Sequence, residues 1–283
     1  MRDVTMIVTG GSMGIGLACA RQLVRVGYDV AICARGRGAL ATAEAALKGE
    51  RGEARVLAVV ADVAREGEFE RVLAAAEELG PVEGVVHAAA VLGPIGHAVE
   101  AEAGAWLETV RANLFGAFLV ARATCRHLIA RKRPGSVVLF SGGGATGPFP
   151  NYSAYACGKV GVVRLAETLA QEVAGSGIRV NCVAPGFVAT RMHQETLRAG
   201  DAAGRAYLER TKKELEGGGV SPKLAACAVA FLLSDESRGI TGRLLAVPWD
   251  DWKTWPQHLG EIQNSDVFTL RRIVPRDRGN DWQ

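Results

Sequence analysis

Short apolar runs alternate along this chain with longer segments in which apolar residues recur every three or four positions. The short runs are typical of buried β-strands, and the longer segments have the period of an amphipathic helix. The predicted strands cover residues 4–8, 28–34, 55–60, 84–87, 136–140, 178–183 and 244–247. The predicted helices cover residues 15–26, 66–79, 104–131, 153–173, 207–215 and 224–233.

This alternation predicts an α/β protein. Strands that recur with helices between them form a parallel sheet with right-handed crossovers and helices on both faces. We therefore expect a single Rossmann-like, doubly wound domain of about seven strands over residues 1–247. Ligands of such sheets bind beyond the carboxyl ends of the strands. The residues that follow strands in this chain are Gly10 to Gly16, Arg35, Asp62, Ala88, Ser141 and Pro185.

The composition narrows the class of protein further. It is 48% hydrophobic and 22% charged, with 35 glycines that indicate many tight turns. The net charge of +3 includes no long basic block, so no nucleic-acid partner is expected. No signal-peptide pattern and no apolar run of membrane-spanning length occurs, which favours a cytoplasmic protein. The six cysteines lack metal-ligand spacing, and we expect reduced cysteines and no metal.

A glycine-rich turn joins the first predicted strand to the first predicted helix. Gly10, Gly14 and Gly16 are spaced Gly-x-x-x-Gly-x-Gly in this turn. Glycines let the backbone turn tightly and approach a diphosphate, which then lies at the positive end of the helix. The position of the turn between strand and helix predicts a dinucleotide site.

Two arginines follow the second predicted strand. An acidic side chain at this place binds the ribose 2′-hydroxyl of NAD, whereas an arginine accommodates the 2′-phosphate of NADP. Arg35 and Arg37 stand here, and no Asp or Glu occupies residues 34–38. The sequence therefore favours NADP(H), and NAD(H) is the alternative cofactor.

A tyrosine and a lysine stand one helical turn apart in the helix over residues 153–173. Tyr155 and Lys159 share one face of that helix, so the ammonium can lie beside the group that the phenol touches. A nearby cation favours the phenolate and would move the phenol from its usual pKa of about 10 toward neutrality. The pair is a candidate for acid/base catalysis, although the same spacing also occurs by chance on many helices.

Over residues 1 to about 247, the chain resembles the short-chain dehydrogenase/reductase family. The motifs that carry the resemblance are Thr9-Gly10-x-x-x-Gly14-x-Gly16, Asp62, Asn113, Ser141, Tyr155-x-x-x-Lys159 and Asn181-x-x-x-Pro185-Gly186-x-x-x-Thr190. Their order and spacing are specific even though each motif alone is weak. The resemblance implies a nicotinamide-dependent oxidoreductase, usually a homotetramer or homodimer, with subunits that meet through the helices near 104–131 and 153–173.

The resemblance also implies a role for each matching residue. Tyr155 would be the general acid/base, Lys159 would lower its pKa and bind the nicotinamide ribose, and Ser141 would bind the substrate oxygen. Asn113 would hold a water of the proton relay. The residues implied in cofactor binding are Gly10, Ser12, Met13, Gly14, Ile15, Gly16, Arg35, Arg37, Asp62, Val63, Ala89, Tyr155, Lys159, Pro185, Gly186, Val188 and Thr190.

Two positions depart from the family pattern inside the motifs. The usual Asn-Asn-Ala-Gly after the fourth strand is here His87-Ala88-Ala89-Ala90, and a structural role is expected for His87. Ser141 stands 14 residues before Tyr155, one more than usual, and the thirteenth position is Gly142. Because Gly142 has no side chain to donate, we take Ser141 as the catalytic serine; a plain turn at the end of the strand is the alternative.

Two segments lie outside the common core of the family. Residues 248–283 form a Trp-rich extension with Trp249, Trp252 and Trp255, which we expect to pack on the domain or on a neighbouring subunit, with substrate-pocket lining as the alternative. Residues 187–219 are expected to form a mobile lid with a glycine hinge at 217–219. Substrate identity should reside in this lid and in the loops at 92–98 and 145–152.

The sequence therefore predicts hydride transfer between a nicotinamide cofactor and a secondary alcohol or ketone. Polar residues in the lid, among them His193, Gln194, Arg198 and Arg205, favour a polar or sugar-like substrate, although the outer face of a lid is polar in any case. Alternatives are a 3-oxoacyl-type ketoreductase, a sugar-nucleotide epimerase or dehydratase, and a dinucleotide-binding regulator without catalysis. The chain is short after Pro185 for the substrate domain that such epimerases carry.

Overall fold

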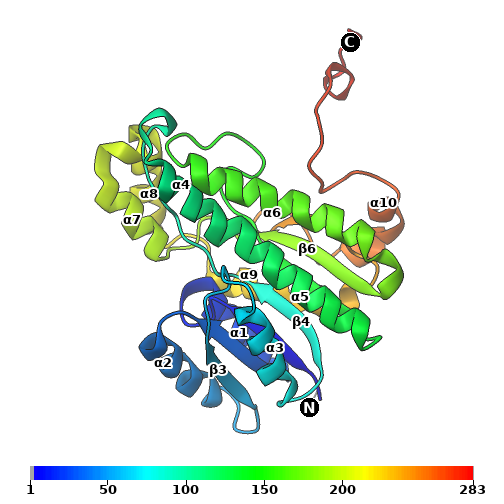
Figure 1. Ribbon diagram of the computed structural model, residues 1–283. Coiled ribbons are helices and arrows are strands. Elements are labelled where there is room, and N and C mark those ends of the chain that lie inside the picture. The colour runs from blue at the N-terminus through cyan, green and yellow to red at the C-terminus, as the bar shows by residue number, and fades with distance from the viewer. Residues whose placement is uncertain (1–2, 283) are drawn as a thin grey trace.

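A parallel seven-stranded sheet forms the centre of the molecule (Figure 1). The computed structural model describes residues 3–282, and the strand order is β3-β2-β1-β4-β5-β6-β7. The strands are β1 (Thr5–Thr9), β2 (Asp29–Ala34), β3 (Val56–Val60), β4 (Val82–His87), β5 (Gly135–Phe140), β6 (Ile178–Ala184) and β7 (Leu244–Ala246). The order reverses between β1 and β4, which is where such sheets bind their ligands.

Helices connect the strands and cover both faces of the sheet. The α-helices are α1 (Gly14–Arg25), α2 (Arg37–Lys48), α3 (Glu68–Glu77), α4 (Ala103–Val110), α5 (Gly116–Ala130), α6 (Ser153–Glu172), α7 (Arg191–Ala199), α8 (Arg205–Glu216), α9 (Pro222–Leu233) and α10 (Leu259–Gln263). The 3₁₀ helices are η1 (Ala98–Glu100), η3 (Ala174–Ser176), η4 (Gly200–Ala203), η5 (Asp235–Ser237), η6 (Trp255–His258) and η7 (Pro275–Arg278), and η2 (Arg111–Phe115) is a π-helix.

The buried side chains form one apolar cluster on each face of the sheet. Alternate residues of a strand point to opposite faces, so Met6 and Val8 of β1 pack with α1, α2 and α9, whereas Ile7 packs with α3, α5 and α6. Both faces of the inner strands are therefore covered, which explains why these strands are apolar throughout. The doubly wound α/β fold predicted from the sequence is confirmed.

The predicted strands all occur in the structure, with ends that differ by one or two residues. Helices α2 and α7 were not predicted, and the helix predicted over residues 104–131 differs in the structure. The structure divides this segment into α4, the π-helical turn η2 and α5. Single π-helical turns inside α-helices occur frequently at functional sites, and this turn contains Asn113.

The C-terminal segment folds back on β7, the edge strand of the sheet. Phe268 accepts a 2.8 Å hydrogen bond from the main-chain amide of Leu244 in β7. The Arg243 guanidinium donates to the carbonyl oxygens of Ser265 and Val267, at 3.1 and 2.9 Å, and to that of Ile262. An unpaired strand edge invites pairing with other chains, and this segment covers it.

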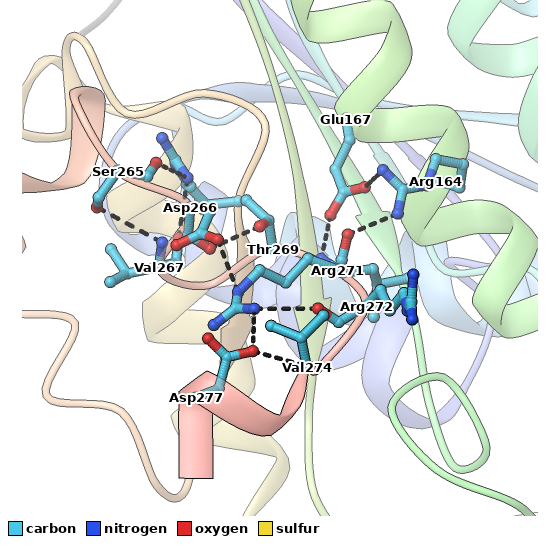
Figure 2. Close-up of polar contacts among 12 residues, drawn as sticks. Arg164, Glu167, Ser265, Asp266, Val267, Thr269, Arg271, Arg272, Val274 and Asp277 are labelled. Atoms are coloured by element: carbon cyan, nitrogen blue, oxygen red, sulfur yellow. Dashed lines mark hydrogen bonds and ion pairs between the residues drawn. The ribbon is translucent and has the colours of Figure 1, made fainter. Parts of the chain in front are cut away.

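Ion pairs fix the end of this segment, as Figure 2 shows. The Arg271 guanidinium lies 2.6 Å from a carboxylate oxygen of Asp266 and 2.6 Å from one of Asp277. On α6, Arg164 donates to the Leu270 carbonyl and Glu167 accepts from the Leu270 amide, both at 2.6 Å. The last part of the chain, which carries η7, leads away from the domain (Figure 1).

The part of the chain that the structure describes contains no candidate for a membrane-spanning helix and none for a metal site. No helix within residues 3–282 has the length and apolar character that crossing a bilayer requires. Over the same residues, His, Cys, Asp and Glu side chains form no group of three or more that could hold a metal ion.

Candidate active site

A cavity of about 730 Å³ lies at the carboxyl edge of the sheet. The turns that follow β1 to β4 line it, and residues 189–194 of the segment predicted as a lid line it from the other side. The predicted cofactor residues that line the cavity are Gly10, Ser12, Met13, Gly14, Ile15, Gly16, Arg35, Asp62, Val63, Ala89 and Thr190. The turns after the first four strands thus share one cavity, and Ser141 and Pro185, which follow β5 and β6, do not line it.

Six of the predicted cofactor residues are not part of the cavity wall. These are Arg37, Tyr155, Lys159, Pro185, Gly186 and Val188. Arg37 is exposed at the first position of α2. Val188 is buried, and a Cβ at Gly186 would lie 2.5 Å from Pro248, so this segment is packed against the start of the C-terminal extension.

The glycine turn lets neighbouring backbone segments and a ligand approach one another closely. A Cβ on Gly16 would lie 2.3 Å from the Gly10 carbonyl oxygen, and one on Gly10 would lie 2.8 Å from the Ala89 nitrogen. Gly14 has a φ of +55°, and its nearest neighbour across the cavity is Thr190. The first-turn amides of α1 have no partners within the helix, and no acidic residue lies in that turn. These features suit a diphosphate.

Arg35 provides positive charge at the end of β2. It is exposed, lines the cavity, and makes no hydrogen bond or ion pair within residues 3–282. On the next strand, Asp62 accepts a 3.1 Å hydrogen bond from the Ala64 amide, which fixes its carboxylate at the cavity wall. The cavity therefore has one arginine free to bind a phosphate at the β2 end.

Tyr155 and Lys159 lie next to each other on α6. The Lys159 ammonium is 5.5 Å from the centre of the Tyr155 ring and donates a 2.9 Å hydrogen bond to the Phe140 carbonyl at the end of β5. Burial lowers the pKa of Lys159 to about 8, so the ammonium is the main form at pH 7. Lys159 thus reaches the end of β5 next to Tyr155, and the role of the pair toward a nicotinamide stays a prediction.

The direction of the Tyr155 shift differs from the prediction. Burial raises the pKa of its phenol above the usual range, and the neighbouring Tyr207 adds to the rise. Lys159 does not reverse this effect because its ammonium faces the Phe140 carbonyl and not the phenol oxygen. Among the protein groups alone, Tyr155 is therefore a protonated phenol, which is the form that donates a proton.

Asn113 is buried in the π-helical turn η2. Its side-chain amide donates to the Val91 carbonyl at 2.8 Å and accepts from the Val91 amide at 2.9 Å. Gly158 of α6 packs directly on it, since a Cβ there would lie 3.0 Å from the Asn113 Cβ. The side chain therefore holds a cavity-lining loop next to α6. Its role in holding a water, which the family resemblance implies, stays a prediction.

Ser141 and Gly142 follow β5, below Tyr155. The Ser141 hydroxyl is buried, and its one hydrogen-bond partner among the described residues is the Lys159 carbonyl at 3.5 Å. By contrast, a Cβ on Gly142 would lie 2.5 Å from the Tyr155 hydroxyl oxygen. The position against the phenol is thus Gly142, and the geometry corresponds to the alternative of a strand-end turn for Ser141.

His87 is buried at the end of β4. Its Nδ1 lies 2.9 Å from the Thr9 hydroxyl, which in turn accepts a 3.3 Å hydrogen bond from the Ala89 amide. Burial and the charge of Lys159 lower the pKa of His87 to about 3. The imidazole is therefore neutral at pH 7 and ties β4 to β1, in agreement with a structural role.

An aromatic cluster joins two of the three segments expected to select the substrate, residues 145–152 and 187–219. The Phe149 ring is 4.4 Å from that of Tyr152, 4.8 Å from that of Tyr207 on α8, and 6.5 Å from that of Tyr155. The Tyr152 hydroxyl donates to Thr196 on α7 at 3.1 Å. This cluster packs the lid segment over the catalytic helix.

The sequence assigned no individual role to several lid residues that line the cavity. Arg191, Met192 and Gln194 come from the first turns of α7, and Leu215 comes from α8. Thr190 could have indicated these residues in the sequence. It stands at the N-cap of α7 and places the start of that helix over the glycine turn.

Comparisons with known proteins agree with the fold. A family model described as enoyl-(acyl carrier protein) reductase matches residues 10–248. Dehydrogenase/reductase SDR family member 4 of Sus scrofa is 32% identical over 248 residues, which are 87% of this chain and 86% of that protein.

Solved structures include relatives with either nicotinamide cofactor. NAD⁺-bound xylitol dehydrogenase has a TM-score of 0.78 and 25% identity, covering 87% of this chain and 97% of that one. A single-residue variant of actinorhodin polyketide ketoreductase with NADPH has a TM-score of 0.77 and 29% identity, covering 93% and 98%. This chain belongs to the short-chain dehydrogenase/reductase family.

Proposed function

We propose that this protein is an NADP(H)-preferring oxidoreductase that interconverts a secondary alcohol and a ketone, with Tyr155 as the acid/base. The observation that carries the proposal is the position of Tyr155 and Lys159, which meet the end of β5 at the same sheet edge as the glycine turn and Arg35. The nicotinamide cofactor supplies or accepts the hydride when bound. The protein side chains and backbone bind and orient the cofactor and the substrate and transfer the proton.

The predicted cofactor residues divide into three groups. The turn from Gly10 to Gly16 would bind the diphosphate at the start of α1, and Asp62 with Val63 would contact the adenine. The segment from Pro185 to Thr190 and Lys159 would hold the nicotinamide half, and of this group Thr190 lines the cavity. The cradle fits this group because a side chain on Gly10 or Gly16 would collide with the backbone and because Arg35 has no other partner among the described residues.

In the reducing direction, Tyr155 donates its proton to the oxygen of a ketone. A protonated phenol is the form that this step requires. To stabilise the phenolate left behind, the Lys159 ammonium would turn from the Phe140 carbonyl toward the phenol oxygen. We propose that the water of the proton relay lies at the π-helical turn, next to the loop that the Asn113 side chain holds through Val91. Asn113 thus positions the relay through the loop that it fixes.

The first test concerns the cofactor. Replacing Arg35 by alanine should weaken NADPH binding by about 10- to 150-fold, because a hydrogen bond to a charged group contributes roughly 1.5–3 kcal/mol. NADH binding should change little, and fluorescence titration measures both. Arg272→Ala removes an exposed arginine on the C-terminal segment and is the control. Equal losses for NADPH and NADH would contradict a contact with the 2′-phosphate.

The side chains on the inner face of the lid indicate the class of substrate. Arg198 and Arg205, which favoured a polar substrate, are exposed on the outside. The side that faces the catalytic helix presents Met192 and Tyr207 to Phe149. We propose that the lid, residues 187–219, closes over an alcohol or ketone with an apolar face. The glycines at 217–219 form its hinge. A panel of ketones that ranges from sugars to cyclic and aryl ketones, assayed with NADPH, tests this substrate class.

The face formed by α5 and α6 is the proposed contact between subunits. Phe115 at the end of η2 and Phe118 of α5 are exposed with ring centres 6.1 Å apart, and Val160 of α6 is exposed as well. Phe118→Glu should convert a homodimer or homotetramer into a smaller species, as measured by light scattering after gel filtration. Ile273→Glu changes an equally apolar exposed residue on the C-terminal segment and should leave the mass unchanged. An unaltered mass for Phe118→Glu would exclude this face.

A further inference from the structure

Three consecutive glycines follow Ser141 in the turn below Tyr155. A Cβ would lie 2.5 Å from the Tyr155 hydroxyl oxygen if placed on Gly142, 2.9 Å from the Phe149 ring if placed on Gly143, and 2.5 Å from the Ala156 side chain if placed on Gly144. Gly144 also has a φ of +83°. No larger side chain fits the turn without displacing the phenol, the ring or α6, so the backbone itself faces Tyr155.

The hydrogen bonds of this turn leave a run of free donors. Ser141 donates its amide to Val183 at 2.9 Å, and Ala145 donates to the Gly142 carbonyl at 3.3 Å. Between them, the amides of Gly142, Gly143 and Gly144 have no acceptor within the described range 3–282. Gly142 and Gly144 are half-buried and Gly143 is exposed, so these amides are open to water or to a bound ligand. Free amides beside a catalytic phenol are suited to an oxygen atom of a ligand.

The Ser141 hydroxyl has a structural role. It is buried and directed at the Lys159 carbonyl on α6. A hydroxyl in that place joins β5 to the catalytic helix, and the structure leaves the surface next to the phenol to Gly142. No side-chain donor of this turn therefore reaches the place where the substrate oxygen would meet Tyr155.

We propose that main-chain amides of Gly142–Gly144, and not a serine hydroxyl, bind the substrate oxygen opposite Tyr155. The inference rests on the proposed function, because it assigns the second donor of that reaction. As hydride from NADPH adds to the carbonyl carbon, the π bond electrons move to the oxygen. The amides stabilise this charge, and the Tyr155 O–H bond breaks as the alcohol O–H bond forms. A single donor of this kind contributes about 10²–10³-fold to turnover in other enzymes.

A pair of variants separates the amide donors from a serine donor. Gly142→Ser places a hydroxyl at the thirteenth position before Tyr155, the spacing usual in the family. A required serine would make this variant faster than the wild type. The amide proposal predicts a loss of kcat of at least about tenfold, because the added Cβ displaces the phenol, with unchanged NADPH affinity. Ser141→Ala should keep kcat within about threefold. A faster Gly142→Ser, or a hundredfold slower Ser141→Ala, would overturn the proposal.

The control for these variants is Gly147→Ala in the same loop. No atom lies within 4 Å of a Cβ on Gly147, so this change should alter neither kcat nor the unfolding temperature. A Gly142→Ser protein that is as stable as the control and still binds NADPH has lost an active-site function and not its fold.

An amide readout keeps the inference separate from the proposed reaction. With ¹⁵N-glycine labelling, trifluoroethanol added to the NADP⁺ complex should shift at least one amide proton of Gly142–Gly144 downfield, and should do so equally in Ser141→Ala. If the wild type reduces no ketone yet shows this shift, the proposed function fails and the amide site stands. Absence of the shift in a protein that turns over ketones would overturn the amide site alone.

Discussion

Replacing Tyr155 by phenylalanine is expected to lower kcat by a factor of about 10²–10⁴, which is the usual contribution of a positioned acid/base. The substitution removes only the phenol oxygen. The ring contacts with Phe149 and with the Lys159 ammonium remain, so the affinity for NADPH should stay nearly the same. Steady-state reduction of the best ketone of the panel, together with NADPH titration, measures both quantities.

Tyr152→Phe is the matched control for this variant. Tyr152 is fully buried in the same aromatic cluster, and its hydroxyl donates to Thr196. Loss of that hydrogen bond should reduce the free energy of unfolding by about 0.5–1.5 kcal/mol and leave turnover within a few fold. Equal turnover in wild type and Tyr155→Phe would refute the acid/base role. NADPH binding without turnover of any ketone in either protein would favour the dinucleotide-binding regulator.

The chemistry of this enzyme class requires several groups at one place, and most of that convergence could be predicted. Parallel strands end at a common edge, so residues far apart in sequence meet there once the strands are located. The apolar runs located the strands within one or two residues, and Gly10, Arg35 and Asp62 indeed line one cavity. This part of the prediction depended only on periodicity and on the chemistry of each turn.

Other features depend on contacts that periodicity does not reveal. The π-helical turn η2 keeps an apolar pattern close to that of an α-helix, and the Val91 contacts of Asn113 span 22 residues. Whether Ser141 or Gly142 faces the phenol depends on the path of a turn with a positive φ at Gly144. A shift of one residue in that path exchanges the group that meets the substrate.

The pKa shifts also required the structure. A lysine one turn from a tyrosine predicts a lowered phenol pKa only if the ammonium faces the phenol oxygen. In the structure, the Lys159 ammonium is held by the Phe140 carbonyl, and burial raises the pKa of Tyr155. The inner face of the lid could not be predicted either. Arg198 is exposed and Tyr207 faces inward, but both belong to amphipathic helices, and only packing decides the orientation of such helices.

Trp255→Ala is expected to lower the free energy of unfolding by about 3–5 kcal/mol, the usual cost of truncating a large buried aromatic residue. Trp255 is 3% exposed and its ring stacks on Phe268 with centres 4.4 Å apart. Phe268 also accepts the hydrogen bond from the edge strand β7. Loss of the indole therefore leaves a cavity where the C-terminal segment joins the sheet.

Trp249→Ala provides the comparison within the same extension, because Trp249 is 70% exposed. Its effect on the free energy of unfolding should stay within about 0.5 kcal/mol, as for most surface substitutions. Urea unfolding, followed by circular dichroism, measures both variants. If the extension contributes to the domain core as proposed, only Trp255→Ala shifts the midpoint strongly. Equal midpoints for the two variants would show that residues 248–283 are attached to the domain without stabilising it.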